Sequence, residues 1–259
     1  WTLTPYSSYL FRHVDSDGSA TNYGPISVSG VRPSINLKSN VKIVDGNGTE
    51  SDPYRLEGDN DTVSSGTLLK DRYSGEYLTF GTGENNLYRI VSHENGNGTK
   101  ITSAEPLKES GVFKTMAFGD NINYSDTNTI GTFLNKDYLT TYVGESYSNM
   151  IEDNTIWYLG EVNSGISYKL AKYIDKFGTA LTTNTTSAKV GLLRLGELMS
   201  GQFGKAENNS DYWTLTPDSI STIRFINNNG YANNDPQDST FAIKPSLNLK
   251  QNVVITSGD

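Results

Sequence analysis

Cysteine is absent from this chain of 259 residues. Its absence excludes disulfide bridges, thiolate nucleophiles and cysteine-based zinc sites. Secreted eukaryotic modules usually carry disulfides, whereas many bacterial surface proteins fold without them. The missing cysteines therefore favour a bacterial, extracellular protein of the cell surface.

Basic residues and long apolar runs are also scarce. The formal net charge is -8 and no basic stripe occurs, which argues against nucleic acid as a partner. No apolar run approaches the roughly 20 residues that span a bilayer, and no signal peptide is present. We expect no membrane insertion in this stretch, and an export signal upstream of it.

Charged residues make up only 19% of the chain and hydrophobic residues 35%. Asn, Ser, Thr, Gly and Tyr fill the difference, which is unusual for a cytosolic enzyme. Disorder is excluded because aromatic residues reach 11% and apolar runs recur along the chain. This composition favours a rigid β-rich scaffold with polar loops.

The strongest feature of the sequence is an internal repeat. Residues 1–5 and 213–217 both read Trp-Thr-Leu-Thr-Pro. Residues 33–38 read Pro-Ser-Ile-Asn-Leu-Lys, and residues 245–250 differ from them only by Leu in place of Ile. At the same offset of about 212 residues, Arg12 matches Arg224 and Gly18 matches Gly230. A common offset for separate matches predicts a tandem repeat of about 212 residues.

The repeat divides the chain into two parts. We predict that residues 1–58 are the C-terminal part of a preceding repeat unit and that residues 59–259 are a nearly complete second unit. The acidic, turn-rich stretch at residues 57–61 is the expected seam. Adjacent repeat units of the same chain are therefore the first expected partners.

Alternation of polar and apolar residues predicts strands at the start of the second unit and in its tail. The expected strands cover residues 76–80, 87–91, 100–102, 223–226 and 243–249. A turn at 227–230 and a long polar loop are expected between the last two. Pro245 suggests an edge strand or a bulge, because proline gives the strand ladder no N–H.

Helical periodicity is confined to short segments. The clearest expected helix covers residues 165–177, capped by Ser164 and ended by Gly178. Residues 132–142 are a second candidate, and residues 190–199 should begin as a strand and finish as a helix. We therefore predict a mixed α+β fold of mainly antiparallel sheets with two or three short helices.

The repeated tail resembles a known module. Its pattern runs from Trp-Thr-Leu-Thr-Pro through a strand bearing Arg and a Gly turn to Pro-Ser-(Ile/Leu)-Asn-Leu-Lys. It is similar to an uncharacterised repeat module of Firmicutes surface and prepilin-like proteins. The tail is also similar to the closing strands of formylglycine-generating-enzyme-like folds, which implies a C-type-lectin-like architecture. Those enzymes work through cysteine, so their activity is not implied here.

Motifs for catalysis are missing. The two histidines, His13 and His93, lie on dissimilar segments, and neither a phosphate-binding glycine loop nor a Gly-x-Ser-x-Gly motif is present. We predict that the protein is not an enzyme. A carbohydrate-active enzyme with paired carboxylates is the less favoured alternative, since no spacing singles out a pair among the 29 acidic residues.

Acidic and amide side chains gather beside the seam, at Asp45, Asn47, Glu50 and Asp52. Such oxygen ligands suit calcium, which would stiffen the joint between units. A solvated acidic linker is the alternative, and the more common one. Calcium is therefore the candidate cofactor, and no other cofactor is expected.

A binding surface is predicted in the repeated tail, from Tyr212, Arg224, Asn228 and Tyr231. Aromatic rings and planar polar groups suit a shallow surface for a host glycan or protein. The segment at 231–240 differs from its counterpart at 19–28 at seven of ten positions. A fixed frame with a variable loop is typical of binding modules. This favours an adhesive module, with a ligand-free structural spacer as the alternative.

A Lys–Asn isopeptide crosslink, known from some pilin domains, is a further hypothesis. It requires a buried lysine, an asparagine and an acid in contact, and the sequence does not place three such residues together.

Overall fold

The structure is a computed structural model that describes the following residues: 2–15, 18–35, 37, 41–46, 48–49, 55–58, 66–94, 98–159, 161–162, 168–169, 184–200 and 210–257. For residues 44–45, 55–58, 94, 161–162, 168–169 and 200 it describes the backbone alone.

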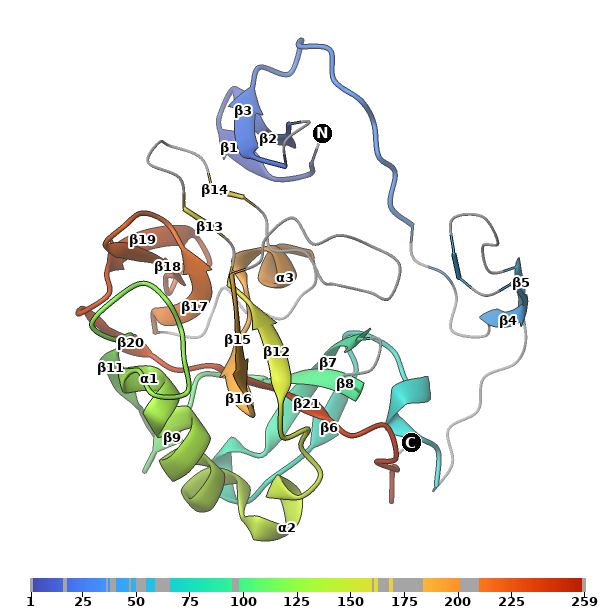
Figure 1. The fold of residues 1–259 in the computed structure, drawn as a ribbon, viewed down its shortest axis with the longest axis vertical. Coiled ribbons are helices and arrows are strands. Elements are labelled where there is room, and N and C mark those ends of the chain that lie inside the picture. Colours follow the sequence, from blue (N-terminus) through green and yellow to red (C-terminus); the bar gives the residue numbers. More distant parts are fainter. Residues whose placement is uncertain are drawn as a thin grey trace.

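Two five-stranded sheets form the body (Figure 1). The first has the order β16 (Val190–Leu192), β21 (Pro245–Leu249), β8 (Gly98–Ser103), β7 (Leu87–Glu94) and β6 (Tyr77–Thr79). The second has the order β11 (Thr115–Ala117), β20 (Thr240–Ala242), β17 (Tyr212–Pro217), β18 (Thr222–Ile226) and β19 (Ala232–Pro236). Neighbouring strands are antiparallel except β17 and β20, which meet in parallel at Tyr212 and Ala242.

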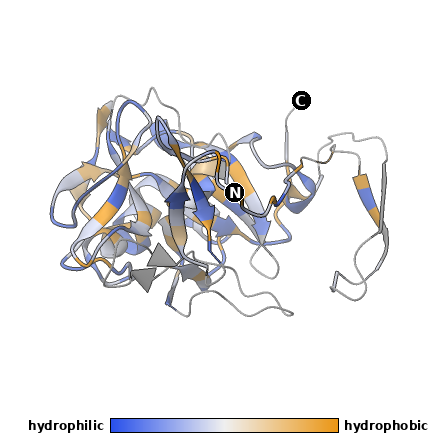
Figure 2. Ribbon diagram, turned by 90° about the horizontal axis from the view of Figure 1, so that it is seen from above, coloured by the Kyte–Doolittle hydropathy of each residue, from blue (hydrophilic) through white to orange (hydrophobic). Residues whose placement is uncertain are grey.

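Smaller sheets complete the β structure. Three are two-stranded pairs within residues 59–259: β12 (Thr155–Tyr158) with β15 (Thr185–Ala188), β9 (Lys108–Glu109) with β10 (Val112–Phe113), and β13 (Glu161–Val162) with β14 (Tyr168–Lys169). The first 58 residues contain β1 (Pro5–Ser7), β2 (Leu10–Val14) and β3 (Ala20–Tyr23) in one sheet, and β4 (Val41–Asp45) with β5 (Arg55–Gly58) in another. Both stand apart from the body in Figure 1, and the β4–β5 pair does so again in the view from above (Figure 2).

Helices are short and lie mostly between β11 and β12. They are α1 (Thr129–Thr132), the π-helical segments η3 (Phe133–Asp137) and η4 (Leu139–Val143), α2 (Glu145–Ser148) and α3 (Leu195–Ser200), with 3₁₀ turns η1 (Leu69–Asp71) and η2 (Gly83–Asn85). The Asn128 side chain caps α1 by accepting from the Gly131 N–H at 2.9 Å. Within the described residues, no helix is long and apolar enough to cross a membrane. The predicted α+β class with mainly antiparallel sheets is confirmed.

An aromatic cluster forms the centre of the core. The Trp213 ring packs edge-on against Phe118, Phe225 and Phe241, with centroid distances of 5.9, 6.4 and 4.6 Å. Its indole N–H donates to the Met116 carbonyl at 2.9 Å. Tyr88 and Tyr138 share a hydrogen bond deeper in the body, and burial raises the pKa of Tyr88 to about 12. Trp213 is therefore a core residue.

The expected strand and helix positions are largely confirmed. Strands β6, β7 and β8 form the predicted meander, and the chain is helical across residues 132–142. Residues 190–199 begin as β16 and continue as α3, as predicted. The predicted strand at 223–226 is β18.

Three expectations need correction. Within the predicted helix at 165–177, residues 168–169 form strand β14, and 165–167 and 170–177 lie outside the described residues. The predicted polar loop after residue 230 contains β19 and β20. Pro245 is not at a sheet edge, because β21 lies between β16 and β8. Proline is tolerated there as the first residue of its strand.

Candidate binding site

The two matching segments of the sequence fold into the same hairpin. Strands β2 and β3 pair in the register Phe11 with Tyr23, and β18 and β19 pair Ile223 with Asp235, which are the corresponding positions. Side-chain contacts recur as well. The Thr2 hydroxyl donates to the Arg12 carbonyl at 2.9 Å, and the Thr214 hydroxyl donates to the Arg224 carbonyl at 2.8 Å. The recurring residues thus specify a common frame.

The turn between β18 and β19 is held by several hydrogen bonds. The Asn227 side-chain oxygen accepts from the N–H of Asn229 at 3.0 Å and of Tyr231 at 2.9 Å. Asp211 accepts from the Asn228 N–H at 2.8 Å. Gly230 adopts a φ of 83°, a left-handed conformation that favours glycine, and Gly18 adopts 85° in the other hairpin. The turn is therefore fixed in shape.

The fixed turn presents polar and aromatic side chains to solvent. Tyr231 is 70% exposed, and Asn228 is exposed beside it. Asn233 and Asn234 are exposed on the neighbouring strand β19, which is the edge of its sheet. A tyrosine ring offers an apolar face, and carboxamides both donate and accept hydrogen bonds. This combination can bind the apolar face and the hydroxyls of a sugar.

Asn233 and Asn234 were not among the predicted site residues. They belong to a segment predicted as loop, and they lie on the same hairpin as Tyr231 and Asn228. The sequence shows two adjacent asparagines shortly after a turn. It does not show that both are exposed on an edge strand.

Tyr212 does not belong to this exposed surface, contrary to the prediction. It is 1% exposed at the start of β17 and packs with Ile226 and Ala242. Burial raises the pKa of its hydroxyl well above the usual value. The ring of Tyr212 lies 5.7 Å from the Lys244 ammonium, which is itself buried. Tyr212 is a core residue of the frame.

Arg224 is also mostly shielded from solvent by contacts with neighbouring residues. Its guanidinium forms an ion pair with Asp218 at 2.5 Å, and only 18% of its side chain is exposed. In the first hairpin the matching Arg12 stacks over the Tyr6 ring at 4.4 Å. Both arginines contact residues just before their own hairpin: Tyr6 on β1, and Asp218 between β17 and β18. The structure therefore places Arg224 as a support for the hairpin, and does not place it with Tyr231.

The predicted calcium ligands are described only in part. The backbone of Asp45 ends strand β4, while Asn47, Glu50 and Asp52 lie outside the described residues. Within the described parts of the chain, no group of three or more His, Asp or Glu side chains could hold a metal ion. Calcium binding at the seam stays a prediction.

An open cleft of about 200 Å³ lies elsewhere, between η2, the β9–β10 turn and η4. Glu84 and Glu109 are the acidic residues in its lining. Glu84 accepts from the Gly111 N–H at 3.1 Å, and Glu109 forms an ion pair with Lys114 at 3.2 Å. Both carboxylates are thus engaged in contacts that hold the local structure. This cleft gives no support to the carbohydrate-active enzyme.

Comparison of the chain with models of known protein families, with curated proteins and with solved structures found no match.

Proposed function

We propose that the chain is a non-enzymatic, adhesive binding module of a bacterial surface or pilus protein built from tandem repeats. The proposed binding face is the turn and edge strand that carry Asn228, Tyr231 and Asn233. The observation that carries the proposal is a hairpin frame that recurs in register while the side chains of the proposed face change. Tyr231 corresponds to Ser19, and Asn233 to Thr21. A constant frame with a changing surface suits recognition of host glycan or protein.

The tandem array is supported by the exposure of matching apolar residues. Those of the second unit are at most 1% exposed, whereas their counterparts in the first 58 residues are 57% to 100% exposed. The matching pairs are Leu215 with Leu3, Ile243 with Val31, Leu247 with Ile35, and Leu249 with Leu37. Apolar residues so exposed require a partner. A preceding unit with strands equivalent to β16 and β8 would cover them.

The proposed C-type-lectin-like architecture belongs to the same hypothesis. Its support is that the closing strand β21 pairs with β8, an early strand of the unit, so that the two ends of the unit meet in one sheet. An extracellular location at the cell surface follows from the proposed adhesive role and from the cysteine-free composition. A structural spacer would share the frame, but would not need Tyr231 exposed.

Glycan binding by the whole chain tests the adhesive role. Residues 1–259 would be screened on a glycan array with and without calcium, and Tyr231→Ala is expected to reduce binding at least tenfold. The loss follows from removal of the ring that would stack on the sugar. Tyr77→Ala is the matched control, since Tyr77 is 52% exposed on β6, outside the hairpin, and it should bind like the parent chain.

The outcomes separate the candidate functions. Binding lost only in Tyr231→Ala supports the adhesive module and locates its face. Equal loss in both variants would place the ligand elsewhere and overturn the proposed face. No glycan bound in either condition would favour the spacer, or a protein ligand. Hydrolysis of an arrayed glycan would favour the enzyme instead.

Limited proteolysis tests the proposed division into units. Arg12 and Arg224 occupy matching positions, and both can be cut by trypsin because no proline follows them. We expect cleavage after Arg12 to be at least ten times faster, because the three-stranded sheet around it leaves apolar residues exposed and should open more readily. Mass spectrometry of a time course measures both rates. Equal rates would show that the first segment is already complete.

A further inference from the structure

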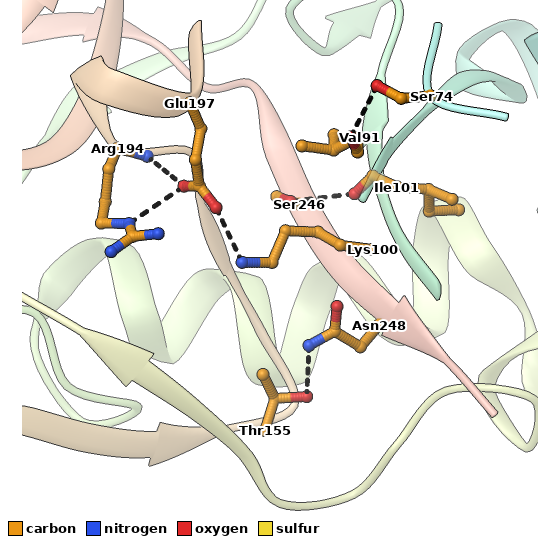
Figure 3. Close-up of polar contacts among 9 residues, drawn as sticks. All are labelled: Ser74, Val91, Lys100, Ile101, Thr155, Arg194, Glu197, Ser246 and Asn248. Carbon is orange, nitrogen blue, oxygen red and sulfur yellow. Dashed lines mark hydrogen bonds and ion pairs between the residues drawn. The ribbon is translucent and has the colours of Figure 1, made fainter. Parts of the chain in front are cut away.

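Lys100 is a lysine buried in the centre of a sheet. It lies on β8, is 2% exposed, and its ammonium donates to Glu197 Oε1 at 2.9 Å (Figure 3). The same ammonium lies 5.2 Å from the centre of the Trp157 ring. A lysine is rarely buried so completely unless it is paired. Lys100 is thus held against the Glu197 carboxylate inside the body of the protein, away from water.

Glu197 is oriented by a second basic residue. Its Oε2 accepts from the Arg194 backbone N–H at 2.9 Å and from the Arg194 Nε at 3.2 Å, at the first turn of α3. These bonds fix the carboxylate plane and direct Oε1 to Lys100 (Figure 3). The side chain of Glu197 is only 12% exposed. The carboxylate is therefore positioned to exchange a proton with the Lys100 amine.

Asn248 lies directly opposite Lys100 in the register of β21 and β8. Directly opposed residues project to the same face of a sheet, with Cβ atoms roughly 4.5–5.5 Å apart. Asn248 is fully buried, and its Nδ2 donates to Thr155 Oγ1 at 3.3 Å. Its Oδ1 has no hydrogen-bond partner among the described residues. A buried, half-satisfied carboxamide beside a buried amine calls for an explanation.

We propose that Lys100 and Asn248 form an isopeptide bond, with Glu197 as the proton carrier. Glu197 accepts a proton from the Lys100 ammonium, and the neutral amine attacks Cγ of Asn248. The protonated Glu197 then donates to the departing carboxamide nitrogen. As the Nζ–Cγ bond forms, Nζ gives up its second proton to Glu197, which passes it on to the released nitrogen; the Cγ–Nδ2 bond breaks and the nitrogen leaves as ammonium. No electrons are gained or lost, so no oxidant or further reactant is needed.

The bond would join the two ends of the unit. Strand β8 lies early in residues 59–259, and β21 is the last strand. A covalent link between them closes the body against a force applied through the chain termini. The proposal rests on contacts within the body alone and does not depend on glycan binding.

Intact mass of the purified chain tests the bond. Residues 1–259 are expected to weigh about 17 Da less than the sequence requires, since one ammonia is lost. Lys100→Arg and Asn248→Ala should both restore the full calculated mass. Asn36→Ala is the matched control, because Asn36 occupies the corresponding position in the first copy of the motif, and it should keep the deficit.

Peptide mapping makes the test independent of the variants' folding. Acylated Lys100 resists trypsin, so the parent chain should yield residues 90–108 joined to residues 225–250 as one branched peptide. A succinimide at an Asn–Gly step loses the same mass but gives no branched peptide, and would overturn the proposal. A separate peptide ending at Lys100, with the full intact mass, would overturn it as well. Glu197→Gln should lack the branch, and Glu197→Asp should restore part of it.

Discussion

Replacing Trp213 by alanine is expected to lower the free energy of unfolding by about 3–5 kcal/mol. The ring is 1% exposed and touches Phe118, Phe225 and Phe241, so its removal leaves a cavity lined by three aromatic rings. The substitution also leaves the partly buried Met116 carbonyl without its indole donor. Urea unfolding of the whole chain, followed by far-UV circular dichroism, measures the change.

Tyr77→Ala is the control for this prediction. Tyr77 is a half-exposed aromatic residue, and its truncation should change stability by less than about 1 kcal/mol. A loss below about 1 kcal/mol in Trp213→Ala as well would contradict the packing described for the aromatic core. It would show that the recurrence of this tryptophan in the sequence has a cause other than the core.

Local patterns predicted the elements whose packing is local. Strands β6, β7 and β8 alternate polar and apolar residues and pair through short connections, so their periodicity carries most of the necessary information. The segment at 190–199 combines an apolar start with a helical finish, which became β16 and α3.

Alternation of polar and apolar residues does not predict a strand that is buried on both faces. Every residue of β17 is buried, because one face packs on the aromatic core and the other on residues such as Leu193 and Leu195. Tyr212 and Trp213 are therefore both inside, although they are adjacent in sequence. A single-strand pattern cannot reveal cover supplied by distant segments.

The cluster of Lys100, Glu197 and Asn248 was not predicted, because its residues meet only through contacts between distant segments. Lys100, Glu197 and Asn248 belong to β8, α3 and β21, and no local spacing relates them. The sequence singled out none of the three. The register of β21 against β8, which the sequence does not state, brings two of them face to face. The tertiary fold therefore defines this cluster, whereas Tyr231 could be predicted from its turn.

The close approach of two backbones at Gly98 gives the second large expected effect. Gly98 begins β8 with a φ of 72°, and a Cβ added there would lie 1.9 Å from the Leu249 carbonyl oxygen. Gly98→Ala must therefore separate β8 from β21 in addition to straining its own backbone. We expect a loss of more than about 3 kcal/mol, measured by urea unfolding of the whole chain.

Gly83→Ala separates the cost of the strained backbone from the cost of the clash between β8 and β21. Gly83 has the same φ of 72°, but an added Cβ meets no atom within 4 Å. Its substitution isolates the cost of a left-handed alanine, about 1–2 kcal/mol. The difference between the two variants then measures the contact between β8 and β21. Equal losses would mean that the two strands are not in close contact at this point, and would weaken the register that places Asn248 opposite Lys100. A larger loss in Gly98→Ala would support both the register and the crosslink that depends on it.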